Sequence, residues 1–277
     1  MKTRHCSYMD IISREVTLPL WLDSFIFDHQ GAKYCKSNSD MTVIDWMPKM
    51  ILNYLGTYFP RSYTEAYCIF KQHLQTTETF EVEESVSMLD FGCGTGGEII
   101  GAATAIAECR PNVRTLKVKA IDGNQYALNR FDEIKDEFNS HHILQILSNP
   151  SAVEIDDFYD LSILNFILDA KYDIVISFKA VCEFVTKQQF EEKNAYEYIA
   201  NFMLPKLSDL GFMLLVDVTT KNNVAQEWLP DLMDKGLNNA GASIIRRNPL
   251  NNVSFIVNHS RQHGDVSKIA WRLITKK

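Results

Sequence analysis

The sequence predicts an α/β fold in which a mostly parallel sheet follows a helical N-terminal segment. From Val86 onward, short apolar runs typical of strands alternate with stretches of helical period. The run at 172–177 is almost continuously apolar, as expected of a strand that is buried on both faces. Such alternation implies parallel strands joined by right-handed crossovers.

The segment before residue 85 has a different character, with helical periodicity and many aromatic residues. Apolar residues at helical spacing predict a helix over 43–58, and Pro60 is expected to break it. Ser62 or Thr64 is expected to cap a second helix that ends near Leu74, followed by a polar linker at 76–84. We therefore expect a helical cap at 1–84 and a sheet domain at 85–277.

The remaining elements follow in chain order. The patterns predict strands at 86–91, 115–121, 143–148, 172–177, 212–217, 253–257 and 268–274, with a further candidate at 242–245. They predict helices at 97–109, 124–138, 157–169, 189–207 and 224–239.

Composition limits the possible function classes. The 277 residues have a net charge of −7, and there is no long basic run, which argues against a protein that grips a nucleic-acid backbone. The six cysteines are dispersed without a Cys-x-x-Cys pair, so we expect no metal centre. No apolar run reaches the ~20 residues that span a bilayer, and Met1–Arg14 lacks the apolar stretch of a signal peptide. These features predict a cytoplasmic protein with no membrane partner.

The strongest functional signal is Val-Ser-Met-Leu-Asp-Phe-Gly-Cys-Gly-Thr-Gly-Gly at 86–97. An acid, Asp90, lies near the end of a strand, three glycines alternate at 92, 94 and 96, and Gly97 opens a helix. Glycine at these positions lets the backbone turn sharply and approach a ligand, as in the nucleotide-binding turn of doubly wound folds. Gly92, Gly94 and Gly97 also match the Gly-x-Gly-x-x-Gly pattern of dinucleotide sites. Asp90 favours a cationic ligand instead, because a carboxylate there would oppose a pyrophosphate.

The stretch acid-x-Gly-x-Gly-x-Gly beginning at Asp90 resembles motif I of the class I S-adenosylmethionine-dependent methyltransferases. The resemblance implies a Rossmann-like sheet of seven strands that closes with an antiparallel pair. It also implies S-adenosylmethionine as cofactor and transfer of its methyl group to an oxygen or nitrogen nucleophile. The cofactor contacts that it implies are Asp90, Gly92, Cys93, Gly94, Gly96, Asp122, Gly123, Asn149, Ser177 and Phe178.

Two of these positions keep an alternative interpretation. Asp122, at the end of the second strand, is expected to accept the ribose hydroxyls, although Asp-Gly pairs also simply form turns. Asn149 is a candidate for the adenine amine, but an Asn-Pro turn explains it equally well.

Candidates for catalysis and substrate binding lie outside motif I. Glu183, His259 and His263 are possible bases for a nucleophile that is protonated at working pH. The two histidines depend on 253–257 being a parallel sixth strand, because only then does the following loop emerge on the ligand side. Candidate substrate contacts are Arg61, Tyr63, Lys179 and Arg261.

The chemistry does not require any of these bases. Methyl transfer from a sulfonium is a direct displacement that depends mainly on alignment and exclusion of water. A methyltransferase can therefore lack a recognisable catalytic residue.

A small molecule is the expected acceptor, with RNA or protein as alternatives. Segments 58–66, 88–97 and 177–184 are also similar to the ribosomal small-subunit methyltransferase-like family, but its cysteine-rich C-terminal segment is missing. A third possibility is a protein that binds S-adenosylmethionine without catalysis.

Overall fold

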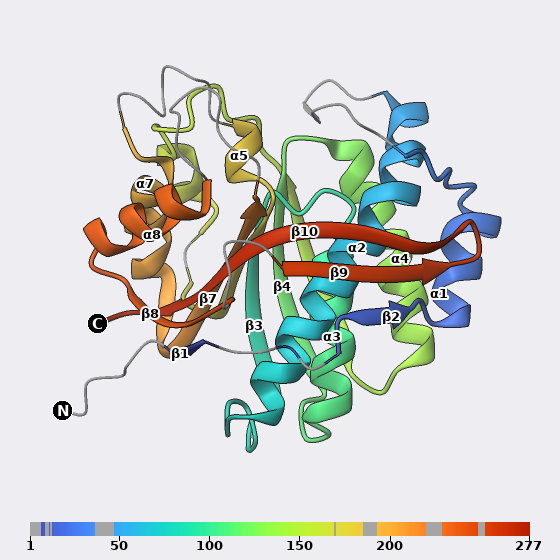
Figure 1. Cartoon of the computed structure of the whole chain (residues 1–277), viewed down its shortest axis with the longest axis horizontal. Coiled ribbons are helices and arrows are strands. Elements are labelled where there is room, and N and C mark those ends of the chain that lie inside the picture. Colours follow the sequence, from blue (N-terminus) through green and yellow to red (C-terminus); the bar gives the residue numbers. More distant parts are fainter. Residues whose placement is uncertain are drawn as a thin grey trace. The chain divides into compact units, whose positions relative to one another are not determined.

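Figure 1 shows a computed structural model of the whole chain. The structure describes residues 7–8, 11, 13–36, 47–168, 170–184, 193–219, 229–248 and 253–277. The starts of the helices predicted at 43, 189 and 224 lie outside these residues. None of the described helices combines the length and the apolar character needed to cross a bilayer.

The chain divides into two compact units. The N-terminal unit comprises Ile11–Glu154 and Ser254–Ser267, and the C-terminal unit comprises Met1–Asp10, Ile155–Val253 and Lys268–Lys277. The division between residues 84 and 85 that the sequence suggests stays a prediction.

Three parallel strands form the sheet of the N-terminal unit. They are β3 (Ser85–Phe91), β4 (Thr115–Asp122) and β5 (Gln145–Ala152). Strand β4 lies between the other two, with Asp90 beside Ala120 and Ile121 beside Ser151. Helices α3 (Gly97–Cys109) and α4 (Gln125–His141) connect the strands, as predicted. The carboxyl ends of β3 and β4 therefore lie next to each other, which brings Asp90 and Asp122 to the same end of the parallel strands.

A single long helix, α2 (Pro48–Gln75), precedes the sheet, so the predicted break at Pro60 is wrong. A proline inside a helix costs about 3 kcal/mol, and here packing offsets that cost. Gly97 and Gly101 of α3 bring the two helix backbones close together: a Cβ on Gly101 would lie 2.3 Å from the Tyr63 carbonyl oxygen of α2.

The chain before α2 and a β-hairpin complete the N-terminal unit. The short elements are β2 (Glu15–Thr17), α1 (Leu20–Ser24) and the π-helical turn η1 (Phe25–His29). Strand β9 (Val253–His259) pairs with β10 (Gln262–Thr275) and, in parallel, with β2. The strand predicted at 253–257 exists, but it is one arm of a hairpin rather than a parallel sixth strand.

The C-terminal unit contains a second set of strands. Strands β6 (Tyr172–Phe178) and β7 (Leu207–Val218) are parallel, and the second half of β10 runs antiparallel to β7, with Trp271 beside Val216. Strand β8 (Ser243–Arg247) is antiparallel to β10, and β1 (Ser7–Tyr8) is parallel to β8. The expected antiparallel closure is therefore made by β8 and β10.

The helices of this unit differ in part from the prediction. They are η2 (Ser162–Phe166), α5 (Val181–Phe184), α7 (Ala195–Met203), η3 (Leu204–Lys206) and α8 (Leu229–Asn239). Where the sequence predicted a helix over 157–169, the described residues form only turns and the 3₁₀ helix η2. The cause is local: the side chain of Asp157 accepts from Tyr159 N at 2.9 Å and that of Asp160 accepts from Ser162 N at 3.1 Å. Such turns compete with helical hydrogen bonds.

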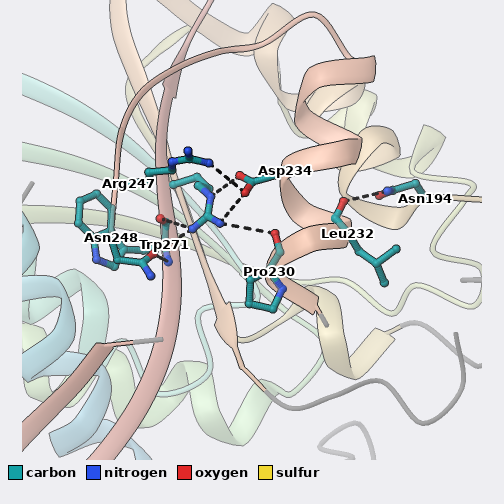
Figure 2. Close-up of polar contacts among 8 residues, drawn as sticks. Asn194, Pro230, Leu232, Asp234, Arg247, Asn248 and Trp271 are labelled. Carbon is teal, nitrogen blue, oxygen red and sulfur yellow. Dashed lines mark hydrogen bonds and ion pairs between the residues drawn. The ribbon is translucent and has the colours of Figure 1, made fainter. Parts of the chain in front are cut away.

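A buried arginine, Arg272 of β10, fixes α8 to two strands of the C-terminal unit. The residue is 2% exposed, and its Nε and Nη2 donate at 2.5 and 2.9 Å to the two oxygens of Asp234, which Figure 2 labels. Its Nη1 donates to Asn248 Oδ1 and to the Trp271 carbonyl oxygen. Arg247 of β8 donates to the same Asp234 carboxylate at 3.1 Å. This network holds one helix and two strands together.

Candidate functional site

The glycine turn, Gly92–Gly97, connects β3 to α3 in the N-terminal unit. Gly92, Gly94 and Gly96 have φ angles of 78°, 48° and 76°, in the left-handed region that side chains other than glycine rarely adopt. The amides of Gly92 and Cys93 donate to the Ile121 carbonyl oxygen of β4 at 2.8 and 3.0 Å. The alternate glycines are therefore required by the turn that they form.

Asp90 lies directly behind this turn in an unusual environment. The residue is 0% exposed, and neither carboxylate oxygen has a hydrogen-bond partner among the described residues. Burial, together with the nearby acids Glu98 and Asp122, holds the pKa of Asp90 well above its ordinary value. An unpaired buried carboxylate destabilises a fold, so a feature of this kind indicates a function.

Asp122 links the second strand to the glycine turn. At the end of β4, its Oδ2 accepts from Gly94 N at 2.7 Å and its Oδ1 accepts from Asn124 N at 2.8 Å. Asn124 in turn caps α4 through its side chain, which accepts from Tyr126 N and Ala127 N. Burial raises the pKa of Asp122, and the two amide donors oppose that rise. Its neighbour Gly123 has space around it, since a Cβ there would be 3.7 Å from the nearest atom, the Val153 carbonyl oxygen.

The charges near the carboxyl ends of β3 and β4 determine which kind of ligand fits there. Asp90, Asp122 and Glu98 are all acidic, and within the described part of the chain no lysine, arginine or histidine forms an ion pair with Asp90 or Asp122. A pyrophosphate would be repelled by such a cluster, whereas an ammonium or sulfonium would be attracted. The residues therefore fit S-adenosylmethionine better than a dinucleotide.

The side chain of Cys93 is buried within the glycine turn. It is 1% exposed, and burial, followed by Asp122 and Asp90, raises the pKa of its thiol well above the ordinary value. The thiol is therefore neutral, and any contact of Cys93 with a ligand is made through its backbone.

Tyr54 of α2 reaches the glycine turn from outside the sheet. Its hydroxyl oxygen lies 2.7 Å from the point where a Cβ on Gly94 would stand. Its ring lies 5.3 Å from that of Tyr58, one helical turn later. No sequence pattern singled out Tyr54, because its place beside Gly94 results from the packing of α2.

The end of β6, in the C-terminal unit, holds four of the predicted residues. Ser177 and Phe178 are buried, and the Ser177 hydroxyl has no hydrogen-bond partner among the described residues. Lys179 has a φ of 57° and donates its amide to the Val216 carbonyl oxygen of β7. Left-handed backbone at a residue other than glycine is strained and marks a turn held by its surroundings. Glu183 follows, half-buried, in the short helix α5.

A buried carboxylate holds this turn in place. Asp217, at the end of β7, is 0% exposed and accepts from Tyr196 Oη at 2.8 Å, Cys182 N at 3.2 Å and Val218 N at 2.8 Å. Burial raises the pKa of Asp217, and the hydrogen bonds from Cys182 and Tyr196 oppose that rise. The sequence could have indicated Asp217, because it is an acid near the end of an apolar strand, but only the fold shows its hydrogen-bond partners.

Asn149 was expected in the turn after a strand at 143–148, but it lies inside the strand. Strand β5 extends to Ala152, four residues beyond the predicted end, so Asn149 lies within the strand beside Lys119. Pro150 does not stop the strand because β5 is at an edge of the sheet, where a missing amide donor is tolerated.

The substrate candidates on α2 have different environments. Tyr63 is 1% exposed and faces α3, where its carbonyl oxygen lies against Gly101. Arg61 instead binds the hairpin: its Nε and Nη2 donate to the two oxygens of Asp265 at 2.7 and 2.8 Å. Tyr34 donates to the same carboxylate at 3.2 Å. Tyr63 thus takes part in helix packing, and Arg61 is bound in a half-buried ion pair.

The remaining candidates lie at the turn of the β9–β10 hairpin. His259 is 3% exposed, its ring stacks on Phe27 at 4.8 Å, and burial lowers its pKa. Arg261 donates to Asp28 at 2.6 Å, and His263 is exposed at the start of β10. Both histidines depended on a parallel sixth strand at 253–257, whereas β9 is one arm of the β9–β10 hairpin and pairs in parallel with the short strand β2.

Comparisons with known proteins identify the fold. No protein family and no curated protein matches the sequence. Among solved structures, the trans-methyltransferase CalH, in complex with SAH, aligns with a TM-score of 0.50 at 12% identity, over 83% of this chain and 62% of its own. The precorrin-6y C5,15-methyltransferase of Geobacter metallireducens aligns at 15% identity, over 77% of this chain and 89% of its own, with a TM-score of 0.46. The glycopeptide N-methyltransferase MtfA, complexed with S-adenosylmethionine, aligns at 10% identity, over 78% of this chain and 94% of its own, with a TM-score of 0.47.

At such identities a structural likeness shows the fold alone, and the alignment with CalH is the strongest of the three. The predicted fold class is confirmed: the chain has the mixed, mostly parallel sheet of the class I methyltransferases, with antiparallel strands at its C-terminal end.

Proposed function

We propose that the protein is an S-adenosylmethionine-dependent methyltransferase. The observation that carries this proposal is Asp90, a fully buried carboxylate without a hydrogen-bond partner among the described residues, directly behind a turn of three left-handed glycines. A fold tolerates such a group where a cationic ligand compensates it. The likeness in fold to the methyltransferase CalH, in complex with SAH, supports S-adenosylmethionine as that ligand by analogy.

The residues of the glycine turn and the end of β4 would hold the cofactor. Asp90 would attract its ammonium group, and the backbone of Gly92–Gly96 would lie against its amino-acid portion. Asp122 would accept the ribose hydroxyls through lone pairs that its two amide donors leave available. When bound, S-adenosylmethionine supplies an electrophilic methyl group on a positively charged sulfur.

The chain's own part in the reaction is to position the acceptor and to exclude water. Within the C-terminal unit, the strained turn at Lys179 leads from the end of β6, where Ser177 and Phe178 lie, to Glu183. Glu183 is the base that we propose for an acceptor that must lose a proton. We do not extend a catalytic role to His259 or His263, because they lie at the hairpin turn.

A small molecule is the proposed acceptor, and the cytoplasm the proposed location. The net charge of −7 opposes the approach of a polyanion such as RNA. Residues 1–84 would then act as a cap that selects the acceptor, and Arg61 is their candidate substrate contact.

A labelled-methyl assay tests the proposal. The protein is incubated with S-adenosylmethionine carrying a radioactive methyl group and with cell extract separated into small-molecule, protein and RNA fractions. We expect label to enter the small-molecule fraction with the wild type and not with Asp90→Ala. Label confined to RNA would identify an RNA methyltransferase instead. Binding of the cofactor without transfer to any fraction would identify a binding protein.

A further inference from the structure

Tyr54 brings a hydroxyl group to the glycine turn from a helix that lies outside the sheet. That hydroxyl oxygen is 2.7 Å, and the nearest ring carbons 3.1 Å, from the position of a Cβ on Gly94. Gly94 is thus restricted twice: its φ of 48° favours glycine, and any side chain there would strike Tyr54. The turn and α2 are fitted to each other at this point.

The ring of Tyr54 is held from the side by a connected set of groups. It contacts Tyr58, with 5.3 Å between ring centroids. The guanidinium of Arg61 lies over the Tyr58 ring at 5.5 Å and is itself bound by Asp265. Because all three side chains project from one face of α2, the hydroxyl is presented to the turn by a rigid helix.

The chemistry of an amino-acid ligand explains why a hydroxyl is needed there. In the proposed cofactor the ammonium and the carboxylate are attached to the same carbon atom, so an ammonium near Asp90 brings the carboxylate into the same region. Asp90, Glu98 and Asp122 would repel that carboxylate. It therefore needs hydrogen-bond donors near the turn.

Two kinds of donor are present there. The N-cap of α3 is Gly96, which makes no side-chain cap, so its first-turn amides face the glycine turn. The second donor is the Tyr54 hydroxyl. We propose that Tyr54 binds the carboxylate of the cofactor's amino-acid end, which makes α2 part of the cofactor site. This inference rests on the proposed function.

Two ligands that differ only at the amino-acid end test it. S-adenosylhomocysteine has that end, whereas 5′-methylthioadenosine has the same adenosine with a methyl group in its place. Their dissociation constants are measured by calorimetry for the wild type, for Tyr54→Phe and for Tyr67→Phe. Tyr67 is the matched control, because its hydroxyl lies on the same helix but binds Lys71 and Glu108.

We expect Tyr54→Phe to weaken S-adenosylhomocysteine about tenfold or more, as for loss of a hydrogen bond to a charged group. It should leave 5′-methylthioadenosine within about twofold, and that retained binding shows that the variant is folded. Tyr67→Phe should change neither ligand.

The possible failures are distinct. If Tyr54→Phe weakens both ligands equally, changes neither or tightens S-adenosylhomocysteine, the inference is wrong while the proposed function stands. If the wild type binds neither ligand, the proposed function is wrong and this inference falls with it.

Discussion

Replacing Asp90 with asparagine should have opposite effects on stability and on ligand binding. The carboxylate is fully buried and accepts no hydrogen bond from the described residues. Asparagine has nearly the same shape and no charge. We therefore expect the ligand-free Asp90→Asn variant to be more stable by about 1–3 kcal/mol, because it removes the negative charge that burial and the neighbouring acids disfavour. The same change should weaken S-adenosylhomocysteine about 10- to 100-fold, since it removes a charge-assisted contact of about 1.5–3 kcal/mol.

Asp217 provides the matched control. It is also 0% exposed and also lies at the end of a parallel strand, but three donors satisfy it. Asp217→Asn weakens those bonds and turns an amide group toward Val218 N, so it should lose about 1–3 kcal/mol of stability. The two substitutions thus have the same chemistry and opposite predicted signs.

The pH dependence of unfolding gives a second measure of Asp90. Because its pKa is raised in the folded state, the folded protein binds more protons than the unfolded chain once the pH exceeds the ordinary aspartate pKa. Stability should therefore fall as the pH rises from about 4 towards the raised pKa, and this fall should be smaller in Asp90→Asn. Urea unfolding at several pH values and calorimetry measure both quantities. A variant that is less stable than the wild type would show that the Asp90 carboxylate does not destabilise the ligand-free fold, and one that binds S-adenosylhomocysteine equally well would show that Asp90 does not contact the ligand.

Three further substitutions test buried contacts within the two units. Gly101→Ala should lose about 1–3 kcal/mol from overpacking against the Tyr63 carbonyl oxygen, more than the ~1 kcal/mol gained in helix propensity; a stabilised variant in urea unfolding would contradict this. Asp234→Ala leaves the buried guanidinium of Arg272 without its carboxylate and should cost about 3 kcal/mol, seen as a lower unfolding midpoint; an unchanged midpoint would show that the ion pair is dispensable. Arg110→Ala should lower the free energy of unfolding by about 2–4 kcal/mol. Arg110 is 7% exposed, and its guanidinium donates to four carbonyl oxygens, including those of Leu74 and Thr77. A loss below about 0.5 kcal/mol, the usual size at a surface position, would contradict this prediction.

The sequence predicts the elements around the glycine turn well because their signals are local. The apolar strand, the three alternate glycines and the alanine-rich helix 97–109 each follow from neighbouring residues, and β3 and α3 have nearly the predicted bounds. Asp90 and Asp122 could be found for the same reason, since each is an acid near the end of an apolar strand.

What sequence reasoning missed depends on contacts between distant segments. Pro60 remains in a helix because α2 packs on α3. The hydroxyl of Tyr54 beside Gly94 and the three donors to Asp217 likewise come from residues far apart in the chain or from neighbouring strands. Local pattern carries no information about such partners.

Direct measurement of ligand binding to the wild-type protein tests whether Asp90, Glu98 and Asp122, behind the glycine turn, select an adenosyl ligand with an ammonium group over one with a pyrophosphate. Calorimetry compares S-adenosylmethionine, S-adenosylhomocysteine and NAD under the same conditions, with Asp122→Ala as the variant that should weaken both adenosyl ligands. We expect saturable binding of S-adenosylmethionine and S-adenosylhomocysteine and none of NAD. Binding of NAD alone would contradict it.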